Sequence, residues 1–377
     1  MTDRFDVAVI GAGVLGLAHA YQSARRGARV LVLERAERAS GASIRNFGML
    51  WPIGQPRGPL YDLARRSLDE WQPVLRDSGV WHEQTGSLHL AYHEDEADVL
   101  AEFARAVAGD GDGCTMLNPA EAVARSSMLN PRGLRAALWS PTETCVDPRQ
   151  VIAALPGWLT KAFGVRFVFG ATATAYEHPH VHAGGREYVA DQLIVCPGDD
   201  RCTLYPGALD TVGLVACKLQ MMRSVPSPDL QLGPMLAGGL TLRHYRAFAQ
   251  CPSLAQVVQR FDRDMPAYGQ YGIHVMASQN GNGELTLGDS HEYGPSIAPF
   301  DQTLIDDLIL TYLGTFLVAP HLRIATRWHG TYVKHPEAPY VTIQPAPHVM
   351  IVTGVGGAGM TLSFGLAAKV VGELFGG

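Results

Sequence analysis

Near its beginning the chain reads DVAVIGAGVLG over residues 6–16, and this stretch decides the fold. After Asp6, the residues of the segment 6–10 are apolar and largely β-branched, which predicts a buried parallel strand. The glycines that follow are spaced as GxGxxG, and a helix-like pattern covers residues 17–26. A second apolar run, residues 28–33, ends at Glu34. The whole segment predicts a complete β-α-β unit of the kind that binds a dinucleotide.

The residue types of this unit suit a nucleotide. Gly11 permits a tight turn, Gly13 lets a pyrophosphate approach the backbone, and Gly16 lets helix and strand pack closely. The free N–H groups at the helix start favour the phosphate charge. Glu34 stands where an acid accepts hydrogen bonds from ribose hydroxyls. We expect these four residues and the adjacent Arg35 to bind the cofactor, although the unit alone permits either NAD or FAD.

Composition narrows the class of protein. With 377 residues, 47% hydrophobic and 18% charged, the chain reads as a folded protein of two domains. A net charge of −6 gives no basic surface for nucleic acid, and no apolar run is long enough for a membrane span. The N-terminus enters the first strand at once, which leaves no room for a signal peptide. We therefore expect a cytoplasmic protein with reduced cysteines.

The sequence gives no motif for a metal ion. The six cysteines have neither zinc-like nor CxxC spacing, and the 14 histidines form no HxH or HExxH group. We therefore expect no metal site.

The chain is predicted to cross between two domains more than once. Short apolar strands and Gly-rich turns assign residues 1–85, 145–213 and 322–377 to a Rossmann-like α/β domain that binds the nucleotide. Strand-like pieces separated by Pro, Gly and Asn turns assign residues 86–144 and 214–321 to a second α+β domain. We expect this second domain to hold a mostly antiparallel sheet and to bind the substrate.

Four blocks, in order along the chain, carry a family resemblance. They are the N-terminal unit, SGAS at 40–43, the strand that ends at Gly198, and WHG at 328–330 followed by VTGVGGAGM at 352–360. In these blocks the chain resembles the D-amino-acid-oxidase-like flavoproteins, the group with glycine and sarcosine oxidases. The resemblance implies an oxidoreductase with FAD as its cofactor. Sarcosine-oxidase-like relatives attach FAD to a Cys in the closing region, whereas no Cys follows Cys251 here, so we expect non-covalent FAD.

The resemblance also implies cofactor contacts beyond the first unit. Backbone N–H groups at the closing Gly turn would stabilise the negative charge of reduced flavin, although an ordinary helix start is the alternative. Arg45 is the one charge in an apolar stretch, and a structural salt bridge is its alternative role. The further expected cofactor residues are Ser43, Arg45, Asn46, Gly198, Gly357, Gly359 and Met360.

A narrower likeness suggests the substrate. The segments RNFGMLWPIGQ at 45–55, CKLQM at 217–221 and GDSHEYG at 288–294 look like the branch associated with phosphonate catabolism. This likeness implies oxidative deamination of a small aminophosphonate related to 2-aminoethylphosphonate, with hydroxylated or N-methylated forms included. A hydride would pass from the amine-bearing carbon to flavin N5, and the electrons to oxygen or another acceptor.

Residues for the substrate follow from this chemistry. Phosphonate oxygens need Arg, Lys, His or hydroxyl donors, and the candidates for substrate binding are Lys218, Arg243, His244, Tyr245 and Ser290. For catalysis we expect His329, Tyr332 and His291. His329 has the pKa of a base that takes the amine proton.

Two positions depart from the relatives. Tyr332 stands where glycine oxidase has an Arg that grips the substrate carboxylate, which leaves room for a different anion. Thr286 aligns with the Lys that relatives use for oxygen activation. We expect an oxidase, and a dehydrogenase stays open.

Two other functions stay open. One is an oxidase of a secondary or N-methylated amino acid. The other is an FAD-binding electron-transfer subunit without its own substrate site.

Overall fold

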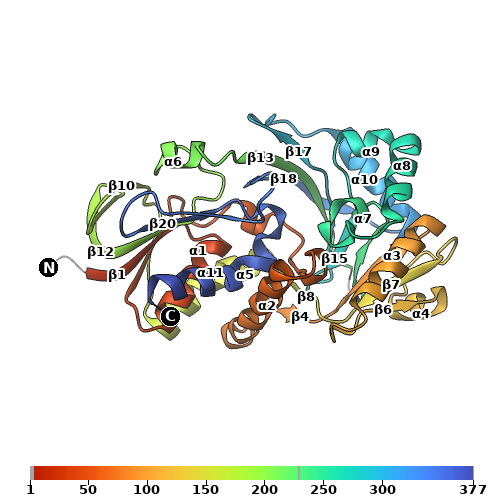
Figure 1. Ribbon diagram of the computed structural model, residues 1–377, viewed down its shortest axis with the longest axis horizontal. Helices are drawn as coiled ribbons and strands as arrows, with labels where there is room; N and C mark the ends of the chain where they lie inside the picture. The colour runs from red at the N-terminus through yellow and green to blue at the C-terminus, as the bar shows by residue number, and fades with distance from the viewer. Residues whose placement is uncertain (1–3, 228–229, 377) are drawn as a thin grey trace.

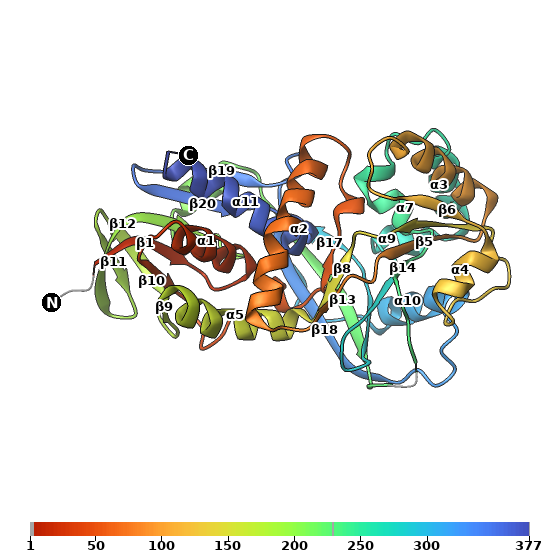
Figure 2. The same ribbon diagram turned by 90° about the horizontal axis from the view of Figure 1, so that it is seen from below.

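Two halves, each built on its own sheet, make up the molecule. The computed structural model describes residues 4–227 and 230–376. The N-terminal and C-terminal segments lie together in one half, and the middle of the chain forms most of the other (Figures 1 and 2). The expected fold class is confirmed: a Rossmann-like α/β half is joined to a half with a mostly antiparallel sheet.

The first half is built on a parallel sheet. β1 pairs in parallel with β2 and β12, β2 with β9, and β12 with β20. Antiparallel strands β10, β11 and β19 extend it. The bounds are β1 (Arg4–Ile10), β2 (Val30–Leu33), β9 (Arg166–Val168), β10 (Ala173–Glu177), β11 (His180–Ala183), β12 (Arg186–Val195), β19 (Val341–Ile343) and β20 (Val349–Thr353).

Four helices bury one face of this sheet. Val7 and Val9 point to that face, and Ala8 to the other, as the two-residue period of a strand requires. The helices are α1 (Val14–Arg25), α2 (Pro59–Ser78), α5 (Pro148–Phe163) and α11 (Gly359–Leu374). The opposite face packs against β10, β11 and the short α6 (Pro206–Asp210). Both faces of the predicted strand are therefore buried.

The second half is a nine-stranded sheet, antiparallel except where β14 pairs with β5. Its strands are β5 (Ser87–Ala91), β6 (Thr115–Leu117), β7 (Ala136–Ser140), β13 (Val215–Ser224), β14 (Met235–Ala237), β15 (Met276–Gln279), β16 (Leu285–Gly288), β17 (Glu292–Gly294) and β18 (Ile324–Lys334). Its helices are α3 (Glu94–Val107), α4 (Pro119–Arg125), α7 (Thr241–His244), α8 (Leu254–Asp264), α9 (Pro266–Gln270) and α10 (Thr303–Phe316).

Short elements join the halves. A small sheet contains β3 (Met49–Leu50), β4 (His82–Glu83) and β8 (Thr144–Val146). The 3-10 turns are η1 (Ala42–Ile44), η2 (Pro52–Gly54), η3 (Arg246–Phe248) and η4 (Gly356–Ala358). Among residues 4–227 and 230–376, no helix has the length and apolarity needed to cross a membrane.

One predicted domain boundary differs from the structure. Residues from 322 onward were assigned to the nucleotide-binding domain, but β18 pairs with β13 along its length, from Val215–Lys334 to Ser224–Ile324. It therefore belongs to the second sheet, and the chain returns to the first half only after Lys334. The sequence of a strand does not show which other strand it pairs with. Here β13 is long enough to pair with all of β18.

The packing of α1 on β1 gives a stability prediction. A Cβ on Gly16 would lie 1.8 Å from the carbonyl oxygen of Gly11, so Gly16→Ala must force the backbone apart. Overpacking of this kind costs about 1–3 kcal/mol. We expect the thermal unfolding midpoint of Gly16→Ala to fall by several degrees.

A matched control is Gly157→Ala on the exposed side of α5. A Cβ on Gly157 would meet nothing within 4 Å. Alanine in a helix interior is favoured over glycine by about 0.5–1 kcal/mol, so the midpoint should rise slightly. Equal midpoints for the two variants would contradict the packing argument.

Candidate active site

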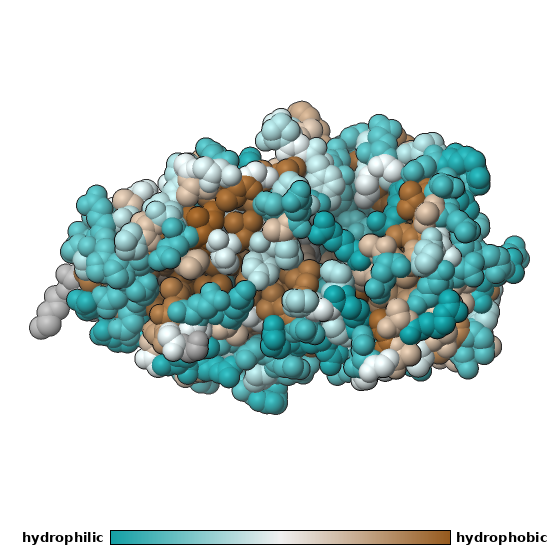
Figure 3. All heavy atoms as spheres, in the orientation of Figure 1, coloured by the Kyte–Doolittle hydropathy of each residue, from teal (hydrophilic) through white to brown (hydrophobic). Residues whose placement is uncertain are grey.

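A cavity of about 620 Å³ lies between the two halves. Its walls come from the ends of β1, β2 and β12, the loop at residues 39–47, strands β13 and β18, and the start of α11. This volume is in the range of small-molecule and cofactor sites. In the space-filling view of Figure 3, apolar side chains gather in the region where Figure 1 shows β20 and α1. Hydrophilic side chains border this region.

The first unit forms one wall with almost no side chains. A Cβ on Gly11, which has a φ of +98°, would lie 2.5 Å from the carbonyl oxygen of Cys196, and one on Gly13 would lie 3.1 Å from Ser43 Oγ. Glu34 accepts hydrogen bonds from the backbone N–H groups of Ala12 (2.8 Å) and Ala36 (3.0 Å). The result is a bare backbone cradle beside a buried carboxylate, which fits the adenosine diphosphate part of a dinucleotide.

Arg35 and Gly198 lie on the rim of this wall. The Arg35 guanidinium donates to Asp200 at 2.9 Å and lies 3.7 Å from Asp199. Gly198, with a φ of +65°, turns the chain away from the end of β12. Both line the cavity, as predicted.

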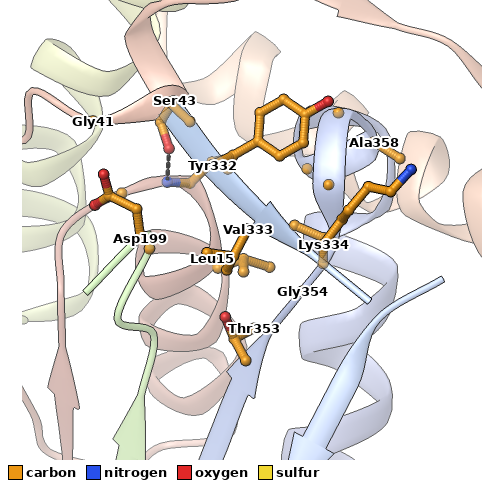
Figure 4. A pocket seen from close by; sticks show the side chains of 18 of the residues that line it. Leu15, Gly41, Ser43, Asp199, Tyr332, Val333, Lys334, Thr353, Gly354 and Ala358 are labelled. Carbon is orange, nitrogen blue, oxygen red and sulfur yellow. Dashed lines mark hydrogen bonds between the residues drawn. The ribbon is translucent and has the colours of Figure 1, made fainter. Parts of the chain in front are cut away.

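The loop at residues 41–47 crosses the start of α1. Ser43 Oγ accepts a hydrogen bond from the Val14 N–H at 2.9 Å, which Figure 4 shows as a dashed line. Asn46 donates to the carbonyl of Ser43 and accepts from the Gly48 N–H. Arg45 donates to the backbone carbonyl of His329 at 3.1 Å. The three predicted residues Ser43, Arg45 and Asn46 thus line the cavity and hold its loop in shape.

The closing Gly turn lies opposite this loop. Gly354 and Gly356 have φ values of +70° and +57°, and η4 leads directly into α11. The carbonyl of Met360 accepts a hydrogen bond from the buried Trp71 indole at 2.9 Å, which fixes the first turn of α11. Gly357, Gly359 and Met360 line the cavity, and the first N–H groups of a helix have no partner within it. This end therefore offers positive backbone dipoles to a ring cofactor.

Imidazole rings gather at the end of the cavity formed by the second half. The ring centroid of His244 lies 3.7 Å from that of His274 and 4.6 Å from that of His291. Asp289 Oδ1 lies 3.1 Å from His274 Nε2, and the His291 Nδ1 lies 3.2 Å from the carbonyl oxygen of Gly272. The three histidines cluster although the sequence has no HxH or HExxH group, because the fold brings together residues that are far apart in the sequence.

The surroundings of these groups disfavour their charged forms. Burial lowers the pKa of His291 to about 4 and the pKa values of His244 and His274 well below the ordinary value. The nearby charge of Lys334 adds to the effect on His244 and His291. Burial also raises the pKa of the Asp289 carboxyl well above its usual range. The cause throughout is the loss of solvation for the charged form.

Tyr332 and Lys334 extend from the same face of β18 into the cavity (Figure 4). The Tyr332 hydroxyl would contact a Cβ on Gly357 at 3.7 Å, so it stands beside the closing Gly turn. Burial raises the pKa of Tyr332, which keeps the phenol protonated. Lys334 Nζ lies 4.5 Å from the centre of the Tyr293 ring. A phenol and an ammonium group therefore face the same space as the imidazoles.

Three predicted site residues lie outside the cavity. Lys218 is fully buried and bonds to the Phe300 carbonyl and to Asp301 (3.1 Å). His329 Nδ1 lies 2.9 Å from Asp301 Oδ1. Ser290 Oγ accepts from the backbone N–H of Gln220 at 3.0 Å. None of the three lines the cavity, so the substrate-binding roles of Lys218 and Ser290 and the catalytic role of His329 stay predictions that this cavity does not support.

The two-residue period of a strand explains two of these positions. On β13, Leu219 and Met221 face the cavity, whereas Lys218 and Gln220 face α10. His329 is opposite Gln220 in the ladder and shares its side. On these two strands the cavity is reached by residues next to them in the sequence, such as Leu219 beside Lys218. Thr286 is likewise buried, opposite Arg223 in the β13–β16 ladder, and does not line the cavity as described.

The other predicted residues do line the cavity, and several lining residues escaped prediction. Arg243, His244, Tyr245, His291 and Tyr332 are all at the wall. His274, Asp289, Tyr293 and Lys334 are there as well but were not singled out. Asp289 lies within the GDSHEYG segment, which was quoted for its likeness, so that segment was the available signal. His274 and Lys334 belong to no motif in the sequence.

Comparison with known proteins identifies the family of the chain. A family model described as FAD dependent oxidoreductase matches residues 6–374. The chain is 31% identical over 163 residues to a glycine oxidase of Geobacillus kaustophilus, covering 41% of this chain and 43% of that protein. It is 29% identical over 216 residues to a monomeric sarcosine oxidase of Streptomyces avermitilis, covering 52% and 53%. The chain thus matches about half the length of these curated relatives.

The solved structures agree with this fold. The L-proline dehydrogenase of P. horikoshii superposes with a TM-score of 0.80 at 19% sequence identity, over 99% of this chain and 94% of that one. At this level of identity the likeness concerns the fold alone.

The role of Glu34 gives a prediction for cofactor binding. Glu34→Ala leaves the N–H groups of Ala12 and Ala36 without their carboxylate acceptor and removes the expected ribose acceptor. An unsatisfied buried donor costs about 1–3 kcal/mol, so the affinity for FAD should fall by about 10–100-fold. Flavin fluorescence during titration of the flavin-free protein with FAD measures this.

Glu37→Ala is the matched control, because Glu37 is an exposed acid close in sequence. It should bind FAD as the unchanged protein does. Unchanged affinity in Glu34→Ala would remove Glu34 from the cofactor site.

Proposed function

Given that the chain belongs to the FAD dependent oxidoreductase family, we propose that it oxidises a small amine bearing a phosphonate group, related to 2-aminoethylphosphonate. Bound FAD would accept a hydride from the amine-bearing carbon, and the imine product would then hydrolyse to a carbonyl compound. The observation that carries the proposal is the end of the cavity with Lys334 and three imidazoles, where Tyr332 stands in place of a carboxylate-binding Arg.

The residues divide the work between two ends of the cavity. The backbone cradle and Glu34 hold the nucleotide, and the start of α11 faces the ring. The apolar side chains of Leu219 and Met221 line the wall of β13 between the two ends. Such a wall excludes water from the reacting carbon.

Lys334 is the group best suited to the anion. Its ammonium faces the cavity beside Tyr293 and lies close enough to His244 and His291 to lower their pKa values. Arg243 and Arg35 line the same cavity, but their guanidinium groups are already paired with Asp262 and Asp200. A dianionic oxygen group binds best beside a cation whose charge is not neutralised by a carboxylate.

FAD is proposed to be bound without a covalent link. Cys196 lines the cavity and Cys217 packs behind Tyr332. Burial raises the pKa of the Cys217 thiol to about 12 and the pKa of Cys196 higher still. The thiolate is the reactive form of cysteine, so neither side chain is activated to attack the ring.

All six cysteines are free, which supports the proposed cytoplasmic location, because thiols stay reduced there. The final electron acceptor is proposed to be oxygen. The case for a dehydrogenase rested on Thr286, and this residue does not line the cavity.

A second candidate is an oxidase of a secondary or N-methylated amino acid. The matched sarcosine oxidase favours it. Arg243 would then have to leave Asp262 to bind the carboxylate.

Anaerobic flavin bleaching separates these functions. We expect 2-aminoethylphosphonate or its hydroxylated or N-methylated forms to bleach the yellow FAD-loaded protein, and glycine, sarcosine and D-alanine to leave it oxidised. Bleaching by the amino acids alone would favour the second candidate. If no amine bleaches the bound flavin, the protein is an electron-transfer subunit.

Lys334→Met tests the anion site. A hydrogen bond to a charged group contributes about 1.5–3 kcal/mol, so the KM for the aminophosphonate should rise by about 10–100-fold, with a smaller change in kcat. Steady-state oxygen uptake or stopped-flow flavin reduction gives both constants.

Lys161→Met is the matched control, since Lys161 is exposed at the end of α5, away from the cavity. Ethylamine, which lacks the anion, should be oxidised equally slowly by the unchanged protein and Lys334→Met. An equal loss for ethylamine and the aminophosphonate would show that Lys334 does not act on the anion.

A further inference from the structure

Three histidines from separate segments point ring nitrogens at a common space in the cavity wall. One nitrogen of each of His244, His274 and His291 lies within 4.8 Å of the corresponding atoms of the other two. His244 ends the short helix α7, His274 precedes β15, and His291 follows β16. We propose that these three side chains bind a divalent transition-metal ion, with one coordination position open to the cavity.

The contacts around the cluster leave one ring nitrogen of His274 and one of His291 available to a metal ion. His274 Nε2 lies 3.1 Å from Asp289 Oδ1 without forming a hydrogen bond to it, and His274 Nδ1 is buried with no hydrogen-bond partner among the described residues. His291 Nδ1 is used on the carbonyl of Gly272, which frees Nε2. Histidines that bind metals donate their other ring N–H to a carboxylate or a backbone carbonyl in this way. The carbonyl of Gly272 fills this role for His291, and the Asp289 carboxyl lies within reach of His274.

His244 completes the set from the cavity side. Its side chain is exposed to the cavity, and no hydrogen bond is found for either ring nitrogen within the described chain. The three ring nitrogens that could bind an ion thus lie within 4.8 Å of one another, with His244 on the open side.

The ligand set indicates which ions fit. Imidazole ligands suit zinc, copper, iron and nickel, and three histidines with one open position are a known zinc arrangement. Nitrogens at about 2.0–2.1 Å from a tetrahedral zinc ion lie about 3.4 Å apart, whereas these nitrogens lie within 4.8 Å of one another, so the widest pair must close by up to about 1.4 Å. His244 has the most room to supply this movement, because it is the exposed member of the three.

The open position has a use if the proposed function is correct. A phosphonate oxygen could become the fourth ligand while Lys334 contacts another oxygen of the same group. This use rests on the proposed function, whereas binding of the metal does not.

Metal content tests the site directly. The FAD-loaded protein, without a histidine tag, is stripped with a chelator and dialysed against Zn²⁺. We expect about one zinc ion per chain, and His244→Ala should weaken zinc binding at least about 10-fold, since it removes a ligand. His180→Ala is the control, because His180 lies on β11 in the first half, where it pairs with Glu187.

Asp289→Asn tests the outer shell, and loss of such a partner typically weakens metal binding by about 10–100-fold. Flavin content and the thermal midpoint confirm that each variant is folded. Absence of zinc from the unchanged protein, or equal zinc affinity in His244→Ala and His180→Ala, would overturn the proposal.

Cobalt tests the open position. Tetrahedral Co²⁺ absorbs at longer wavelengths than oxidised flavin, so its bands are visible in the FAD-loaded protein. Inorganic phosphate should shift these bands if the fourth position faces the cavity, and no shift would overturn that part of the proposal. A protein that binds zinc but is not bleached by aminophosphonates contradicts only the proposed function, and one that is bleached without binding zinc contradicts only the metal site.

Discussion

The close contact between the turn after β1 and the start of α1 is the constraint on which the rest of the structure depends. Gly16 packs directly on the carbonyl of Gly11, and no side chain can be placed between them. This contact fixes the direction of α1, so that its N-terminus opens toward the cavity. Glu34 then ties the end of β2 to the same turn through Ala12. The loop at Ser43 and the start of α11 can form opposite walls only because α1 is held there.

The paired strands β13 and β18 divide the second half into two environments. One side of the pair faces the cavity with Met221 and Tyr332, and the other is covered by α10 through Gln220 and Asp306. At its end β18 forms a bridge to the closing Gly turn, from Lys334 to Val355. A single strand therefore carries the substrate wall directly to the cofactor wall, which sets their relative positions without a flexible linker.

The nucleotide site could be predicted from the sequence because its determinants are local. Gly11, Gly13 and Gly16 act through the backbone of one turn, and their spacing alone defines that turn. The substrate end depends instead on which strand pairs with which and in what register. Lys218 and Leu219 are neighbours, yet only Leu219 reaches the cavity, and a shift of one residue would exchange them. His274 could not be foreseen, since its partner Asp289 comes from another strand.

The cofactor end and the substrate end of the cavity also differ in which part of the chain forms them. The nucleotide wall is largely backbone, so substitutions outside the glycines leave its N–H groups in place. The opposite end is made of side chains, namely the imidazoles, Lys334 and Tyr332, so its chemistry depends on residue identity. A fold of this kind can therefore keep FAD while its substrate changes. Membership of the family therefore indicates the cofactor, whereas the substrate has to be inferred from the imidazoles and Lys334.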